Sequence, residues 1–104
     1  MTDFGLSEET TKILKEYFSQ IHEIKAVKIY GSRALGTFRK GSDIDFVLYG
    51  DIDKDLLAKI NYEIDELNTP YMFDITNYAA IQNDNLKEHI DKYAKVFFIN
   101  HNIL

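Results

Sequence analysis

The sequence predicts a small α+β domain, a mixed α/β fold in which helices flank a mixed β-sheet. Along the chain, apolar residues with helical spacing alternate with short segments of strand-like alternation. The composition is that of an ordinary globular protein, with 45% hydrophobic and 28% charged residues. Because its 104 residues contain no internal repeat and no linker-like stretch, the chain is expected to form a single domain, residues 1–104.

Three helices are expected from apolar residues that recur on one face. The first follows Ser7, an N-cap residue type, with Glu8 and Glu9 in the first turn, where the helix dipole favours acidic side chains. The second is expected over residues 54–67 and the third over residues 83–93. The apolar faces are formed by Ile13, Leu14, Tyr17, Phe18 and Ile21, by Leu56, Leu57, Ile60, Ile64 and Leu67, and by Leu86, Ile90 and Tyr93 or Ala94.

Strands are expected where apolar and polar residues alternate. Residues 26–30 form the first of them, which ends at Gly31, and residues 43–49 and 71–76 form two more. Residues 96–99 form a short apolar run, which is either a further strand or a segment that docks on the core. Helices and strands therefore alternate along the chain, as an α+β or α/β domain requires.

The composition excludes several classes of function. With 17 acidic against 12 basic residues, the formal net charge is −5, so a long nucleic-acid template is an unfavourable partner. The chain contains no cysteine, which excludes disulfides and thiolate zinc sites. No apolar stretch resembles a signal peptide or a membrane span, so we expect a cytoplasmic protein that contacts neither a membrane nor, directly, a nucleic acid.

The most informative feature is an aspartate pair that follows a Gly-Ser turn. Asp43 and Asp45 stand at positions i and i+2 of an expected strand, and their side chains are therefore expected on the same face. Two carboxylates on one face repel each other unless a cation lies between them, and carboxylate oxygens are the ligands that Mg²⁺ prefers. A solvated strand face is the alternative explanation. The preceding turn and the apolar flanks favour a metal site.

Asp74 is the third candidate ligand. It lies within the apolar strand expected over residues 71–76, where an acidic side chain needs a partner. If this strand lies beside the strand that carries Asp45, three carboxylates can hold two cations about 3.5–4 Å apart, an arrangement that supports in-line phosphoryl displacement. The alternative is an aspartate that faces solvent at a strand edge.

The turn before the aspartates is a candidate phosphate site. Gly31 and Ser32 can present backbone N–H groups and a hydroxyl to phosphate oxygens, which suggests a nucleoside triphosphate as the substrate. Arg33 is expected to contact phosphate because its guanidinium group suits that geometry. Ser42 is expected either to cap the start of the strand or to order a metal-bound water. Arg39 and Lys40 are equally well explained as phosphate ligands or as solvated loop charges.

His22, His89 and His101 are scattered, and surface roles are expected for them.

These residues resemble a known family. Gly31-Ser32, ten further residues, Asp43-x-Asp45 and a later Asp74 are similar to the pattern of the polymerase-β-type nucleotidyltransferases, and the short chain resembles their minimal nucleotidyltransferase (MNT) branch. Many members of that branch are antitoxins that accompany a HEPN-domain ribonuclease toxin. The resemblance covers nearly the whole chain. One departure is Leu35, which occupies a position where many relatives have a second arginine.

The resemblance implies a mixed sheet flanked by helices, with Asp43 and Asp45 bridging two Mg²⁺ ions and Asp74 on the catalytic metal. It also implies that Gly31 and Ser32 bind the outer phosphates of ATP. The expected activity is transfer of AMP from ATP to a hydroxyl. The antitoxin branch implies that this hydroxyl belongs to a tyrosine of the HEPN toxin. The alternatives are a nucleotidyltransferase that modifies a small molecule, and a binding module that neutralises the toxin without catalysis. Tailing of a nucleic acid is disfavoured by the acidic net charge.

Overall fold

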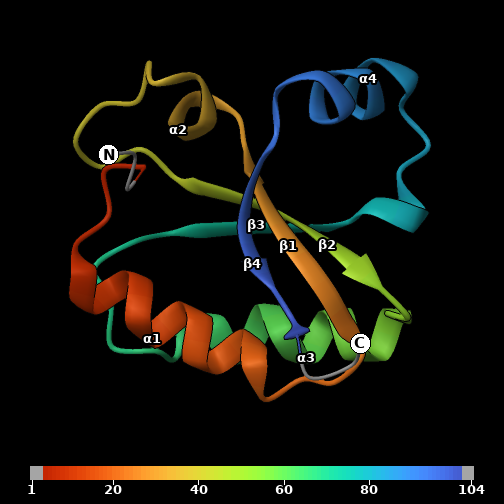
Figure 1. The fold of residues 1–104 in the computed structure, drawn as a ribbon, viewed down its shortest axis with the longest axis horizontal. Helices are drawn as coiled ribbons and strands as arrows, with labels where there is room; N and C mark the ends of the chain where they lie inside the picture. The colour runs from red at the N-terminus through yellow and green to blue at the C-terminus, as the bar shows by residue number, and fades with distance from the viewer. Residues whose placement is uncertain (1–3, 102–104) are drawn as a thin grey trace.

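The computed structural model describes residues 4–101 and confirms the predicted fold class, with helices packed on a four-stranded mixed sheet (Figure 1). The elements follow one another as α1 (Glu8–Ser19), β1 (Ile24–Tyr30), α2 (Ser32–Leu35), β2 (Ile44–Gly50), α3 (Lys54–Asp65), β3 (Phe73–Asn77), the short 3₁₀ helix η1 (Tyr78–Ala80), α4 (Asp84–Tyr93) and β4 (Lys95–Ile99).

The strand order in the sheet is β3-β2-β1-β4. The pairs β1–β2 and β1–β4 are antiparallel, whereas β2 and β3 are parallel and are joined by the crossover through α3. In the register, Asp45 of β2 is paired with Tyr30 of β1 on one side and with Asp74 of β3 on the other. This register brings residues that are far apart in the sequence into one row across the sheet.

The three longer helices begin at polar side chains that cap their first turns. Ser7, Asp53 and Asn83 each accept a hydrogen bond from the backbone N–H three residues further along, in α1, α3 and α4 respectively. Such caps satisfy N–H groups that have no partner within the helix. The predicted start of the first helix at Ser7 is therefore confirmed.

Some predicted boundaries differ from the observed ones by one or two residues. Helix α3 ends at Asp65 rather than at residue 67, and the strand predicted over residues 71–76 runs from Phe73 to Asn77. Strand β2 begins at Ile44, so Asp43 lies just before the strand and not within it. Of the two alternatives for residues 96–99, the strand is observed, because this segment pairs with β1.

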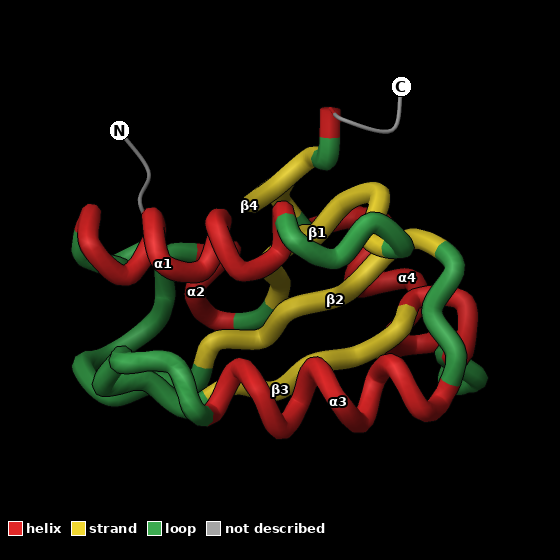
Figure 2. The backbone as a smooth tube through the Cα atoms, turned by 90° about the horizontal axis from the view of Figure 1, so that it is seen from below, coloured by secondary structure: helices red, strands yellow, loops and turns green. Residues whose placement is uncertain are grey.

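The main core lies between the sheet and the pair α1 and α3, which both lie below the strands in Figure 1. Figure 2 looks from that side, and the strands are seen between the two helices. Phe18 of α1 is fully buried, and its ring packs against those of Phe46, Phe97 and Phe98. The helical apolar face that the sequence predicts for α1 is therefore the face that covers the sheet.

A smaller core covers the other face of the sheet, beneath α4. Its buried members are Tyr30, Val47 and Ile90, with Leu86 and Tyr78 among the partly buried residues around them. Along β2, Ile44, Phe46 and Leu48 belong to the main core, while Val47 belongs to the smaller one. Because side chains alternate along a strand, Asp45 shares the face of Val47, on the side of α4. No helix within residues 4–101 is long and apolar enough to cross a membrane.

Candidate active site

The candidate site is a row of side chains at one end of three neighbouring strands. Residues that are directly paired in a sheet point to the same face, so Asp74, Asp45 and Tyr30 lie side by side on the α4 side of the sheet. The predicted proximity of the strand that carries Asp74 to the strand that carries Asp45 is therefore observed. Asp74 is exposed, Asp45 is half-buried and Tyr30 is buried, which makes Asp45 the carboxylate deepest in the row.

Asp45 lies in an unfavourable environment for its negative charge. Burial raises the pKa of its carboxyl group, and the nearby Asp74 and Asp43 raise it further. Arg33 and His89 act in the opposite direction and lower that pKa. The net result is a raised pKa, because burial and the two neighbouring aspartates together outweigh the effect of the nearby cations.

The three aspartates fit a divalent cation by their chemistry. Carboxylate oxygens suit Mg²⁺, and the mutual repulsion felt by Asp45 is the electrostatic condition that a cation relieves. Asp43 is exposed and directly precedes β2, so it flanks Asp45 from the loop side. Within residues 4–101, no three acidic or histidine side chains converge closely enough to count as a ready-made metal cluster. Binding of a cation therefore requires the exposed Asp43 and Asp74 side chains to turn toward Asp45.

Gly31 connects the row to the turn that follows β1. Its φ is +73°, a value that L-residues rarely adopt, and its carbonyl accepts hydrogen bonds from the N–H groups of Ala34 and Leu35 in α2. A Cβ atom at this position would collide with Oδ2 of Asp45. The carboxylate therefore lies directly against the backbone of the Gly31-Ser32 turn.

The guanidinium group of Arg33 donates to backbone carbonyls. The residue is only 4% exposed, and its Nη2 donates to the carbonyl of Ser42 at 2.7 Å while Nη1 donates to that of Phe4 at 2.8 Å. Its Nε donates to the carbonyls of Ser42 and Asp43, each at 3.3 Å. Phe38 and Tyr71 also pack against the guanidinium group, at 5.0 and 5.2 Å from their ring centroids.

These contacts give Arg33 a positioning role that differs from the expected contact with phosphate. The guanidinium group ties α2 to the segment that leads into β2, and so fixes the Gly31-Ser32 turn relative to Asp43. The sequence could not reveal this role, because main-chain carbonyls carry no signal in the pattern of residue types.

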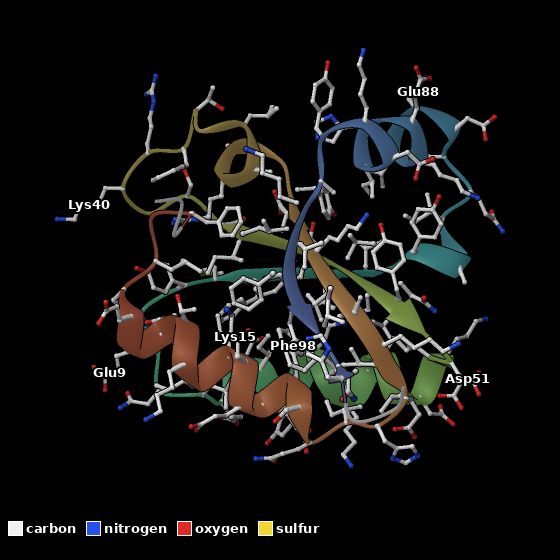
Figure 3. All side chains as sticks on the ribbon, in the orientation of Figure 1. Glu9, Lys15, Lys40, Asp51, Glu88 and Phe98 are labelled. Atoms are coloured by element: carbon white, nitrogen blue, oxygen red, sulfur yellow. The ribbon has the colours of Figure 1, made fainter. Side chains whose placement is uncertain are left out.

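Ser42 and the neighbouring basic residues belong to the loop between α2 and β2. The hydroxyl of Ser42 accepts from the backbone N–H of Arg39 at 2.8 Å, so it closes a turn, in agreement with a capping role. Arg39 and Lys40 are exposed, and Figure 3 shows Lys40 pointing outward, away from α4. This orientation favours the interpretation of Lys40 as a solvated loop charge.

Two residues that the sequence did not single out for the site lie beside the aspartates. The hydroxyl of Tyr30 is 3.3 Å from Oγ1 of Thr76, and its pKa is raised by burial and by the charges of Asp74 and Asp45. The ring of His89 in α4 lies 6.3 Å from the ring of Tyr30. Tyr30 could have been found by pairing the strand ends, whereas the place of His89 depends on how α4 packs on the sheet.

A comparison with protein families finds a match over most of the chain. Residues 12–102 match the family described as Polymerase beta, Nucleotidyltransferase. The chain belongs to this family. This match confirms the resemblance to the polymerase-β-type nucleotidyltransferases that Gly31-Ser32 and Asp43-x-Asp45 indicate. The curated proteins contain no match to this nucleotidyltransferase.

Several solved structures with the same fold come from toxin–antitoxin complexes. A chain of the MntA–HpeT toxin–antitoxin variant with two aspartates changed to glutamate is 14% identical, with a TM-score of 0.67 over 94% of this nucleotidyltransferase and 77% of that chain. A chain of a toxin–antitoxin with AMP-PNP is 17% identical, with a TM-score of 0.60 over 93% and 77%.

A third similar chain belongs to the tri-AMPylated HEPN toxin of Shewanella oneidensis in complex with its MNT antitoxin. It is 15% identical, with a TM-score of 0.56, and the match covers 93% of this nucleotidyltransferase and 76% of that chain. At such low identity these likenesses establish the shared fold.

The close approach of Gly31 to Asp45 can be tested with two alanine variants. Gly31→Ala and Gly36→Ala both place a side chain at positive φ. Gly36, with ψ +11°, is left-handed helical, where the strain is about 1–2 kcal/mol and a Cβ meets nothing within 4 Å, whereas Gly31, with ψ −153°, lies in a region that is essentially restricted to glycine. We expect Gly31→Ala to weaken binding of Mg²⁺–ATP at least tenfold more than Gly36→Ala, because only the former displaces the Asp45 carboxylate. Isothermal titration calorimetry measures both affinities, and equal losses would show that the contact is unimportant.

The role of Arg33 predicts a loss of stability. Arg33→Met leaves buried carbonyls without their charged donor, and we expect the free energy of unfolding to fall by at least about 1.5–3 kcal/mol. The matched variant Arg39→Met removes an exposed charge and should change it by less than about 0.5 kcal/mol. Urea denaturation measures both. An Arg33→Met protein that is as stable as Arg39→Met but has lost affinity for triphosphate would instead make Arg33 a phosphate ligand.

The raised pKa of Asp45 predicts that its charge destabilises the metal-free protein. The folded state holds the Asp45 proton to a higher pH than the unfolded chain, so stability from this group falls as pH rises through the raised pKa. We expect Asp45→Asn to be more stable than the wild type at pH 7 in EDTA, with the difference vanishing below the ordinary aspartate pKa of 3.8. Asp51→Asn, at an exposed position, is the control. Denaturant unfolding across this pH range measures the difference, and an Asp45→Asn protein less stable at pH 7 would contradict the prediction.

Proposed function

We propose that this nucleotidyltransferase transfers AMP from ATP to a tyrosine hydroxyl of a partner HEPN ribonuclease toxin in the cytoplasm, and thereby acts as its antitoxin. The observation that carries the proposal is the pairing of Asp45 with Asp74 beside the Gly31-Ser32 turn. Family membership supports nucleotidyl transfer, and the likeness to a chain from a complex with an AMPylated HEPN toxin supports such a toxin as the acceptor.

Each residue of the site has a proposed role. Gly31 and Ser32 bind the outer phosphates at the turn between β1 and α2, where Arg33 holds the backbone in place. Asp43, Asp45 and Asp74 hold two Mg²⁺ ions, with Ser42 supporting the loop that carries Asp43. When bound, such ions neutralise phosphate charge and lower the pKa of the acceptor hydroxyl.

The reaction is a displacement at the α-phosphorus of ATP. The acceptor oxygen forms a bond to this phosphorus while the bond from the phosphorus to the bridging oxygen breaks, and pyrophosphate leaves. The hydroxyl proton passes to Asp74, which is the most accessible base because its side chain is exposed on the edge strand β3. The pyrophosphate leaves on the side of Gly31 and Ser32, opposite the acceptor.

An acceptor on a separate molecule suits the position of Asp74. In the strand order β3-β2-β1-β4, β3 has no strand on its outer side, and Asp74 faces solvent there. A side chain from another protein can therefore reach Asp74 without displacing any part of residues 4–101. A small-molecule acceptor can reach the same edge, but the fold likeness to toxin–antitoxin chains favours a protein.

The proposal is tested by incubating the purified chain, Mg²⁺ and ATP with its gene neighbour, the candidate HEPN protein, and measuring the intact mass of that protein. We expect a gain of one or more AMP units. Because metal coordination contributes several kcal/mol to such reactions, Asp43→Ala should slow the transfer by at least about a hundredfold.

Asp51→Ala, which removes an exposed aspartate from the far end of β2, should leave the transfer unchanged. A stable complex in which the HEPN protein never gains AMP would refute catalysis and leave a binding module. Modification of small hydroxyl compounds without any protein partner would instead identify a small-molecule nucleotidyltransferase.

A further inference from the structure

The wall of the site formed by α4 contains features that the proposed function does not yet use. The guanidinium group of Arg33 already donates hydrogen bonds to backbone carbonyls. The α2 side therefore presents few groups that could bind the part of a nucleotide beyond its phosphates. Across from it, α4 presents Tyr93, a large aromatic residue that is 41% exposed, together with His89 and Lys92. Helix α4 faces α2 across the end of β1 in Figure 1.

These α4 residues line a cavity of about 300 Å³, formed by Asn85, Glu88, His89, Lys92 and Tyr93. They recur every three or four residues, so they occupy one side of the helix. Glu88 projects outward from α4 in Figure 3 and marks the outer rim of this cavity. A volume at the lower end of the range for ligand sites is large enough for part of a nucleotide.

The inner end of the cavity adjoins the aspartates. The ring of His89 lies 6.3 Å from that of Tyr30, and Tyr30 is paired with Asp45 in the sheet. A molecule whose phosphates lie at Gly31 and Asp45 can therefore extend along this side of α4.

The chemistry of the cavity suits a planar heterocycle. The rings of His89 and Tyr93 stand 5.3 Å apart at 48°, and they provide an aromatic surface. Asn85 and Glu88 provide an amide and a carboxylate at the rim, where the polar edge of a base needs partners. Nζ of Lys92 lies 5.4 Å from the centroid of the Tyr93 ring, a cation–π contact that is weaker than stacking of a base. A base can therefore displace this flexible side chain.

We propose that the α4 cavity binds the nucleobase of the donor nucleotide, which stacks on Tyr93. The inference rests on the proposed function, because it presumes that the site holds a nucleoside triphosphate. Tyr93 is a binding residue in this scheme and takes no part in the chemical step. Lys92, once displaced from the ring, is free to turn toward the phosphates.

The test compares two ligands that differ in the base and ribose. Binding of ATP and of inorganic tripolyphosphate, both with Mg²⁺, is measured by calorimetry for the wild type and for Tyr93→Ala. Loss of stacking should weaken ATP binding by about 5- to 150-fold, while tripolyphosphate binding stays unchanged. Tyr93→Phe keeps the ring and should retain the affinity for ATP. Tyr62→Ala, at a residue 68% exposed on α3, should alter neither ligand.

Tyr93→Leu provides the same comparison if the alanine variant fails to fold, since leucine keeps apolar volume but has no aromatic face. Equal affinity of Tyr93→Ala and the wild type for ATP would overturn the inference, as would equal weakening of ATP and tripolyphosphate. A variant that binds ATP normally but binds the HEPN protein poorly would overturn it too, by assigning Tyr93 to the partner. A wild type that binds neither ligand would refute the proposed function itself.

Discussion

The central position of β2 is the constraint on which the site depends. This strand pairs with β1 in the antiparallel sense and with β3 in the parallel sense, and the register places Asp45 between Tyr30 and Asp74. A shift of one residue in either pairing would turn the paired side chains to opposite faces of the sheet. The burial of Ile44, Phe46 and Leu48 against α1 and α3 opposes such a shift, because it would expose the main core. The core therefore determines which carboxylates meet on the other face.

The loop between β1 and β2 adds a second constraint, which is electrostatic as well as steric. Arg33 is buried with its guanidinium hydrogen atoms directed at carbonyls, so its charge is fixed beneath the turn without an acidic partner in direct contact among residues 4–101. That charge lowers the pKa of Asp45, but burial and the two other aspartates outweigh it. Arg33 thus holds the turn in place while leaving the site short of positive charge, a deficit that a divalent cation is suited to fill.

Much of this organisation follows from the sequence. The spacing of Leu14 and Phe18 predicts the buried face of α1, and Gly31-Ser32 with Asp43-x-Asp45 identifies the family. The sequence does not reveal the contacts of Arg33 with the main chain, because residue type alone cannot distinguish a guanidinium group that binds phosphate from one that binds backbone carbonyls. It also passes over His89, whose position depends on packing between α4 and the sheet. Contacts to the main chain and contacts between distant elements leave little trace in local patterns.

The electrostatics of Asp45 bear on how the site can respond to a cation. A carboxylate whose pKa is raised by burial and by neighbouring carboxylates destabilises the fold while it is charged, so the bare site costs stability at neutral pH. A ligand that binds only the folded state restores that stability, by an amount that grows with the logarithm of the ratio of its concentration to its Kd. Because Asp43 and Asp74 are exposed on either side of Asp45, they can turn inward when a cation arrives without repacking the core. The electrostatic cost is thus confined to the row of aspartates at the surface, and the two cores on either side of the sheet need not change when a cation binds.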